Sequence, residues 1–181
     1  MVLQGQEEFQ RGIHYEVDTD QEPIGVGGTG VVYRGIMIDE KSGVRRDVAI
    51  KFLYNDLPES AIERSRREAT IHIVHENLVE MLGFVHVQGR ENNGNPVSHY
   101  HVVSELLNGV MLLDMLKEEV PDSVYTKYPR VKDFHEDLLN DRNSFALKVV
   151  RCVLSGIMAL HDNVFLFGIL PVLVKPFIKT S

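Results

Sequence analysis

The segment that most constrains the fold of this chain is a run of eight residues that contains four glycines, Gly25-Val26-Gly27-Gly28-Thr29-Gly30-Val31-Val32. Glycine lets a backbone approach a phosphate closely and adopt positive φ. The same glycine spacing occurs in dinucleotide-binding loops, where the last glycine opens a helix. Here the glycines are followed by Val31, Val32 and Tyr33, residue types that favour a strand. The segment therefore predicts a β-hairpin with glycines at its tip, and an ordinary glycine turn would give the same pattern.

A lysine stands in the next apolar segment, Asp47 to Leu53, which is predicted to be a strand. The strand reads Val48-Ala49-Ile50-Lys51, and an ammonium group in such a strand needs a polar partner. A bound phosphate together with a carboxylate from a helix would supply one. The alternative is an edge-strand lysine that extends into solvent.

A glycine hairpin followed by Val-Ala-Ile-Lys resembles the first half of the signature of eukaryotic-type protein kinase domains, of the serine/threonine-like kind. The resemblance implies that the hairpin covers ATP and that Lys51 holds its α- and β-phosphates. Val32 and Ala49 would line the adenine pocket, although both could be ordinary core residues. The implied ATP-binding residues are Gly25, Val26, Gly27, Gly28, Thr29, Gly30, Val32, Ala49, Lys51, Glu105 and Leu107.

The helix after Lys51 is predicted to begin near Ser60, because Ser60 and Glu63 have the spacing of a capping box. In the kinase family a glutamate of this helix pairs with the strand lysine. The resemblance implies that Glu68 has this role, since the capping box accounts for Glu63. An exposed acidic residue on the helix is the alternative interpretation of Glu68.

Residues 101–109 resemble the fifth kinase strand as it enters the hinge, where the family binds adenine through backbone hydrogen bonds. The match places Ser104 at the gatekeeper position and the stretch from Glu105 to Leu107 along the hinge. A plain buried strand that ends near Gly109 would have the same sequence pattern.

The order of predicted elements indicates an α+β fold, protein-kinase-like, with a five-stranded antiparallel sheet and one helix in the first lobe. The first helices of an incomplete helical lobe follow, at residues 110–117 and 144–161. Between them, residues 118–143 are predicted to form a charged, solvated loop with some helix. The expected division is a polar lead-in at 1–16, an ATP-binding lobe at 17–107, the start of a helical lobe at 108–163 and a divergent apolar tail at 164–181.

The last part of the sequence lacks the residues that a kinase needs for transfer. A kinase would next present His-Arg-Asp and Asp-Phe-Gly, whose aspartates act as base and magnesium ligand. From Val164 to Ser181 there is no Asp, Glu, Asn, Gln or His. We therefore expect a domain truncated before the catalytic loop, with Lys51 and Glu68 as a supporting pair only and no ligands for Mg²⁺. A frameshift, an early stop or an alternative transcript end would each produce such a tail.

Composition narrows the cellular setting. With 19 basic and 26 acidic residues the net charge is −7, which disfavours nucleic-acid and anionic-membrane partners. The single cysteine, Cys152, excludes an intrachain disulfide and suits a reducing compartment. The first 16 residues lack the pattern of a signal peptide, and the longest apolar run, Val164 to Val174, is shorter than the ~20 residues of a membrane helix. We expect a cytoplasmic protein.

The expected function is ATP binding in a family that transfers phosphate to serine and threonine of proteins, with this chain itself inactive. Expected partners are ATP, a protein substrate or a full-length kinase. Two alternatives remain open on the sequence: a pseudokinase-like binding module and a non-functional remnant of a kinase gene.

Overall fold

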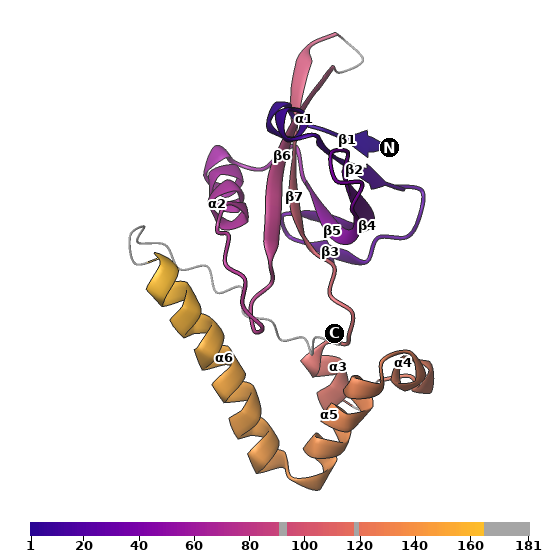
Figure 1. Ribbon diagram of the computed structural model, residues 1–181, viewed down its shortest axis with the longest axis vertical. Helices are drawn as coiled ribbons and strands as arrows, with labels where there is room; N and C mark the ends of the chain where they lie inside the picture. The colour runs from indigo at the N-terminus through magenta and orange to yellow at the C-terminus, as the bar shows by residue number, and fades with distance from the viewer. Residues whose placement is uncertain (91–93, 118–119, 165–181) are drawn as a thin grey trace. The chain divides into compact units, whose positions relative to one another are not determined.

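The computed structural model describes residues 1–90, 94–117 and 120–164, so the predicted apolar tail lies outside the described residues except for Val164. The chain divides into two compact units (Figure 1). Unit 1 comprises residues 1–72 and 80–106, and unit 2 comprises residues 73–79 and 107–181. Each unit has its own cluster of buried apolar side chains.

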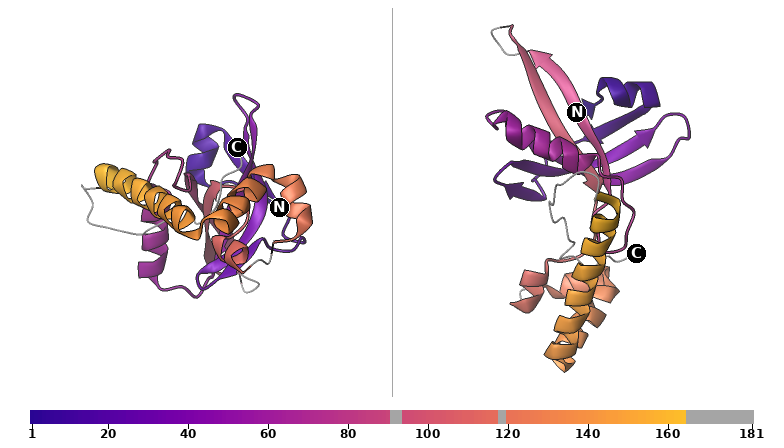
Figure 2. Two further views of the ribbon diagram at one scale, coloured as in Figure 1. Left: turned by 90° about the horizontal axis from the view of Figure 1, so that it is seen from below. Right: turned by 90° about the vertical axis from the view of Figure 1, so that its left-hand side faces the viewer.

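Unit 1 is built on one antiparallel sheet in the order β1-β2-β4-β5-β7-β6, with β3 paired to β4. The elements are β1 (Val2–Leu3), α1 (Gln6–Arg11), β2 (Ile13–Val17), β3 (Gly25–Gly27), β4 (Gly30–Asp39), β5 (Arg45–Leu53), α2 (Glu59–Ala69), β6 (Met81–Arg90) and β7 (Pro96–Glu105). The hairpin of β6 and β7 extends past the other strands (Figures 1 and 2), because β5 pairs only with residues 101–105 of β7.

The sheet has seven strands where the sequence predicted five. Strand β2 pairs with residues 35–39 of β4, and β3 pairs with residues 30–32 of the same strand. Both strands therefore follow one edge of β4, separated by residues 18–24. The Asp18 side chain accepts from the backbone N–H of Asp20 at 3.2 Å, and Pro23 has no N–H to give to a ladder. These residues turn the chain away from β4 before it returns.

The two additional strands, β1 and β2, come almost entirely from residues 1–16, which the sequence predicted to be a polar lead-in. These residues contain β1, α1 and most of β2, and they help to close the core of unit 1. β1 lies at the opposite edge of the sheet from β6, yet an added Cβ on Gly5 would lie 2.9 Å from the His86 carbonyl oxygen of β6. The sheet thus curls until its two edges meet around the core. Glu8, the N3 residue of α1, is buried; burial raises its pKa, and the backbone groups of Glu8 and Gly5 offset part of that rise.

The core of unit 1 lies on one face of the curled sheet. Its members are apolar strand residues that alternate with half-exposed neighbours, as expected for a sheet with one buried face. The buried residues are Leu3, Tyr15, Val17, Val48, Ile50, Val85 and Val103.

Helix α2 packs on β6 and β7, where the Arg66 guanidinium lies 4.9 Å from the centre of the Phe84 ring. The predicted capping box is wrong. The helix begins directly after Pro58, whose backbone is extended, and no side chain caps it. Ser60 is thus already inside the first turn, while Glu63 pairs with Arg66 at 3.2 Å.

Unit 2 is helical in its described part: α3 (Leu112–Leu116), α4 (Asp122–Lys127), α5 (Pro129–Asn140) and α6 (Arg142–Val164). Residues 120–143, which belong to the predicted loop with some helix, are therefore mostly helix. Its charged residues lie on the outside of α5, which buries Val131 and Leu138 on its other side. Proline at the first position of α5 suits a helix start.

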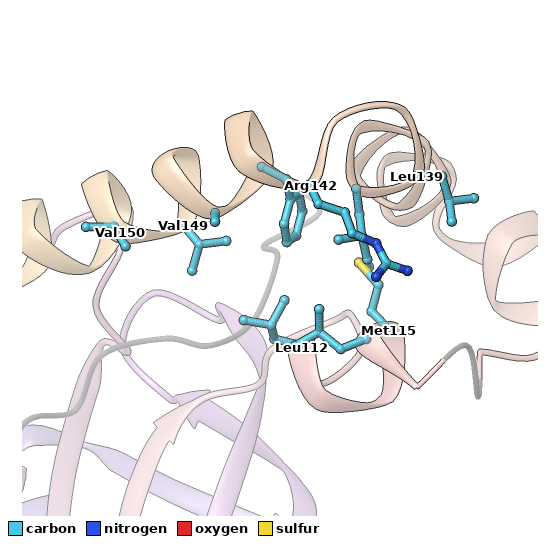
Figure 3. Close-up of a pocket in the computed structure, with 10 residues that line it drawn as sticks. Leu112, Met115, Leu139, Arg142, Val149 and Val150 are labelled. Carbon is cyan, nitrogen blue, oxygen red and sulfur yellow. The ribbon is translucent and has the colours of Figure 1, made fainter.

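An apolar pocket of about 330 Å³ lies between α3, α5 and α6 (Figure 3). Met115 of α3 and Phe145 of α6 are the most buried residues that line it, and Arg142 of α6 lines it as well. Within the described residues, α6 is the one helix whose length and composition would allow a membrane crossing, and core helices of water-soluble proteins meet the same criteria.

Candidate functional site

The glycine-rich segment forms a hairpin in which β3 and β4 are joined by Gly28 and Thr29. Gly27 pairs with Gly30, and the backbone N–H of Tyr54 donates to the Thr29 carbonyl at 3.2 Å. The tip of the hairpin is thus attached to the end of β5. Because the last glycine leads into a strand, the dinucleotide-binding alternative does not describe this loop.

The glycines of the hairpin serve close approach rather than unusual backbone angles. Among the described glycines, positive φ occurs at Gly12, Gly43 and Gly94, none of which lies in the hairpin. A Cβ on Gly30 would collide with the Phe52 carbonyl of β5, whereas a Cβ on Gly28 would meet nothing within 4 Å. Gly30 therefore brings two backbones together, and Gly28 leaves open space at the tip.

This contrast predicts opposite outcomes for two alanine substitutions. Gly30→Ala should destabilise unit 1 by about 1–3 kcal/mol, because the backbone of β5 must shift to admit the methyl group. Gly28→Ala is the matched control, for which we expect a change within about 0.5 kcal/mol. Urea unfolding followed by circular dichroism measures both, and equal losses would contradict the assigned role of Gly30.

Cross-strand register gathers the remaining candidates of unit 1 on one face of the sheet. Lys51 pairs with Val32 on one side and with Val102 on the other. Ala49, two residues earlier on β5, pairs with Ser104. Residues that are paired or two apart point to the same side, so these side chains share the face opposite the buried Val48 and Ile50. The face carries Lys51 beside small and apolar side chains, and Arg34, which pairs with Ala49, lies on it as well.

The ammonium group of Lys51 donates to the Thr29 hydroxyl at 2.5 Å, which connects the strand lysine to the hairpin tip. Glu68 lies near enough for the Lys51 charge to act on it, but no direct ion pair joins these two described residues. Burial raises the pKa of Glu68, and the charges of Lys51 and Arg64 offset part of that rise. The predicted pair is therefore present as neighbours, with Lys51 engaged by Thr29.

A cation next to a hairpin of small residues suits an anionic ligand. Backbone N–H groups at a glycine turn and a nearby ammonium group both attract phosphate oxygens. Thr29 is half-buried, and its hydroxyl occupies the Lys51 ammonium. An incoming phosphate would replace that hydroxyl as the partner of Lys51.

The end of β7 contains a feature that the sequence analysis missed. Glu105 was assigned a role for its backbone alone, yet its side chain is only 5% exposed. Its carboxylate accepts from the backbone N–H of Glu80 at 2.9 Å, and the Glu80 carboxylate pairs with Arg46 at 2.5 Å. Only the acidic type of residue 105 within an apolar strand could have signalled this arrangement. Leu107, the last candidate, belongs to unit 2.

The described residues do not fit a magnesium site. No group of three or more His, Cys, Asp or Glu side chains among them lies close enough together to hold a metal ion. We therefore assign no metal-dependent step to this part of the chain.

Comparison with known proteins gives one finding. A family model described as "Protein tyrosine and serine/threonine kinase" matches residues 19–166. A search among curated proteins found no significant match. The matched range includes every candidate residue described above.

Proposed function

Because this chain belongs to the family of protein tyrosine and serine/threonine kinases, we propose that it binds ATP on the face of unit 1 that carries the glycine hairpin, Ala49 and Lys51. The observation that carries the proposal is the register that puts Lys51 beside Val32 and next to Ala49, with its ammonium at the hairpin tip. In this proposal the hairpin residues from Gly25 to Gly30 cover the phosphates and Lys51 binds them.

The adenine would lie against Val32 and Ala49. The backbone from Glu105 to Leu107, which continues out of β7, would provide its hydrogen bonds. Unit 1 is then the ATP-binding lobe and the helices of unit 2 the beginning of the second lobe. Serine and threonine are the acceptor residues we propose, as the resemblance of the motifs implies, and we place the protein in the cytoplasm because of its acidic charge and single cysteine.

A second candidate function is binding without catalysis. The observation that favours it is the engagement of Lys51 by Thr29 in place of a direct pair with Glu68. Transfer in this family requires that ion pair together with a magnesium-binding aspartate. The 18 residues after Asn163 contain no carboxylate. We therefore propose that the chain as given holds nucleotide, or docks on a complete kinase, without transferring phosphate itself.

The decisive experiment is a thermal shift of the full chain with MgATP, in the wild type and in Lys51→Met. Nucleotide at 100 times its dissociation constant should stabilise the wild type by about 2.7 kcal/mol. We expect that gain to shrink at least severalfold in Lys51→Met, since the phosphates lose their cation. Lys41→Met is the matched control, because Lys41 is exposed in the turn between β4 and β5.

Absence of any shift in the wild type would refute ATP binding, and equal shifts in all three proteins would refute the role of Lys51. Incorporation of labelled phosphate into a mixed protein substrate would contradict the proposal that the chain is inactive.

A further inference from the structure

Two glutamates face each other at the end of the β6–β7 ladder. Glu80 stands directly before β6 and Glu105 is the last residue of β7. The Glu105 backbone N–H donates to the Glu80 carbonyl at 2.9 Å. The return bond comes from a side chain: the Glu80 N–H donates to the Glu105 carboxylate, also at 2.9 Å. A carboxylate thus takes the place of a backbone carbonyl in the last rung of the ladder.

Arg46 of β5 compensates the negative charge of this pair. Its guanidinium lies 2.5 Å from the Glu80 carboxylate. Hydrogen bonding to Glu80 and the charges of Glu80 and Glu105 raise the pKa of Arg46, against a smaller effect of burial. A carboxylate that is 5% exposed needs such compensation, because an isolated buried charge is strongly unfavourable. Three strands, β5, β6 and β7, are thereby joined by polar contacts at one point.

The contacts among Arg46, Glu80 and Glu105 lie where the chain enters and leaves unit 1. The chain passes between the two units after His72, after Val79 and after Leu106. Glu80 is the first residue of unit 1 after the second of these crossings, and Glu105 is the last residue but one of unit 1 before the third. The carboxylate of Glu105 therefore fixes both strands where the backbone leaves the sheet.

We propose that the Glu105 carboxylate is a positioning group, which fixes the backbone direction of residues 105–107 and so preorganises their hydrogen-bonding groups for adenine. This inference rests on the proposed ATP binding. It assigns the side chain of Glu105 a role separate from the backbone contacts of the same residue. If the carboxylate only stabilised the core, its removal would weaken the binding of all ligands on this face equally. If it positions the backbone, its removal should weaken mainly the binding of ligands that contain adenine.

The first test is amide hydrogen exchange of the ligand-free full chain. In Glu105→Ala, exchange in peptides covering residues 79–82 and 104–109 should accelerate about tenfold, the effect of losing one charge-assisted hydrogen bond. Peptides of β4 should keep their wild-type rates. Arg45→Ala is the matched control, because Arg45 neighbours Arg46 but forms an exposed pair with Glu16 at 3.0 Å.

The second test compares ATP with inorganic tripolyphosphate, which lacks the adenine. Glu105→Ala should weaken ATP binding about tenfold and change tripolyphosphate binding less than about twofold. Glu105→Gln retains an oxygen acceptor for the Glu80 N–H, so it should recover most of the ATP affinity. If Glu105→Ala does not fold, Glu105→Gln still allows both measurements.

Unchanged exchange at residues 104–109 in Glu105→Ala would overturn the inference, as would an equal loss of ATP and tripolyphosphate affinity. Failure of Glu105→Gln to recover ATP affinity would likewise overturn it. A wild-type chain that binds no ATP refutes the proposed function instead, and the exchange measurement then decides alone whether Glu105 positions the backbone.

Discussion

Acidification from pH 7 to pH 4 should destabilise unit 1 by about 3 kcal/mol through His101 alone. His101 of β7 is 5% exposed, and its ring packs edge-to-face on Phe52 with centroids 4.4 Å apart. Its Nδ1 atom has no hydrogen-bond partner among the described residues. Burial, with a smaller effect of the His99 charge, lowers the pKa of His101 from 6.5 to about 4.

The sign of the effect follows from proton binding. Below pH 6.5 the unfolded chain protonates this histidine, while the folded state keeps it neutral until about pH 4. The unfolded state therefore binds more protons in this window, and stability falls as the pH falls. Above pH 6.5 both states are neutral and the histidine adds no pH dependence. Each pKa unit corresponds to about 1.4 kcal/mol, which sets the expected size.

His101→Phe isolates this contribution, because it keeps an aromatic ring against Phe52 and removes the titration. Urea unfolding at half-unit steps from pH 7.5 to pH 4 should show a flatter pH profile in the variant than in the wild type. His72→Phe is the matched control, since His72 is exposed just after α2 and its loss should leave the profile unchanged. If the unfolding free energies of His101→Phe and the wild type depended on pH in the same way, the protonated His101 ring would have to gain a hydrogen-bond partner in the folded state.

His101 also illustrates what the sequence could not predict. Its alternation with Val103 suggests one face of a strand, but burial of that face depends on what covers it. This face of the strand is buried because the sheet curls, and the curling depends on contacts between β6 and the first residues of the chain. Such contacts between distant segments leave no local pattern in the sequence.

The candidate site was the more predictable part. Gly30, Ala49 and Lys51 belong to short motifs whose spacing within strands decides which side each residue faces. Pairing of adjacent antiparallel strands then brings these motifs together with little freedom. The partner of Lys51 was less predictable, because a hydroxyl at the hairpin tip and a carboxylate on α2 both lie within its reach. The choice between them depends on side-chain placement that motif spacing does not encode.

The N-terminal segment was predicted least well, for a reason that lies in single residues. A short apolar set of Leu3, Tyr15 and Val17 is spread among polar residues, so hydrophobic periodicity is weak there. Glu8, a charged residue type that is usually exposed, is buried in this segment. Each of these residues is explained only by its contacts with the rest of the sheet.

Tyr15→Ala should therefore cost unit 1 about 3–5 kcal/mol, as expected for removal of a large aromatic side chain from a packed core. Tyr15 of β2 is 1% exposed, and burial raises the pKa of its phenol to about 12. It packs in the same cluster as Ile50 and Val103, on the side of the sheet opposite Lys51. A loss of this size would approach the whole stability of a small domain.

Phe9→Ala is the matched control for this prediction, because Phe9 lies in the same segment but is 72% exposed. We expect it to change the free energy of unfolding by less than about 0.5 kcal/mol. Urea unfolding at pH 7.5 measures both variants in a window where His101 adds nothing. A small effect of Tyr15→Ala would mean that residues 1–17 contribute little to burying the core of unit 1. Other residues would then have to bury it. A large effect restricted to Tyr15 would establish that the first seventeen residues stabilise β5 on the side of the sheet opposite Lys51.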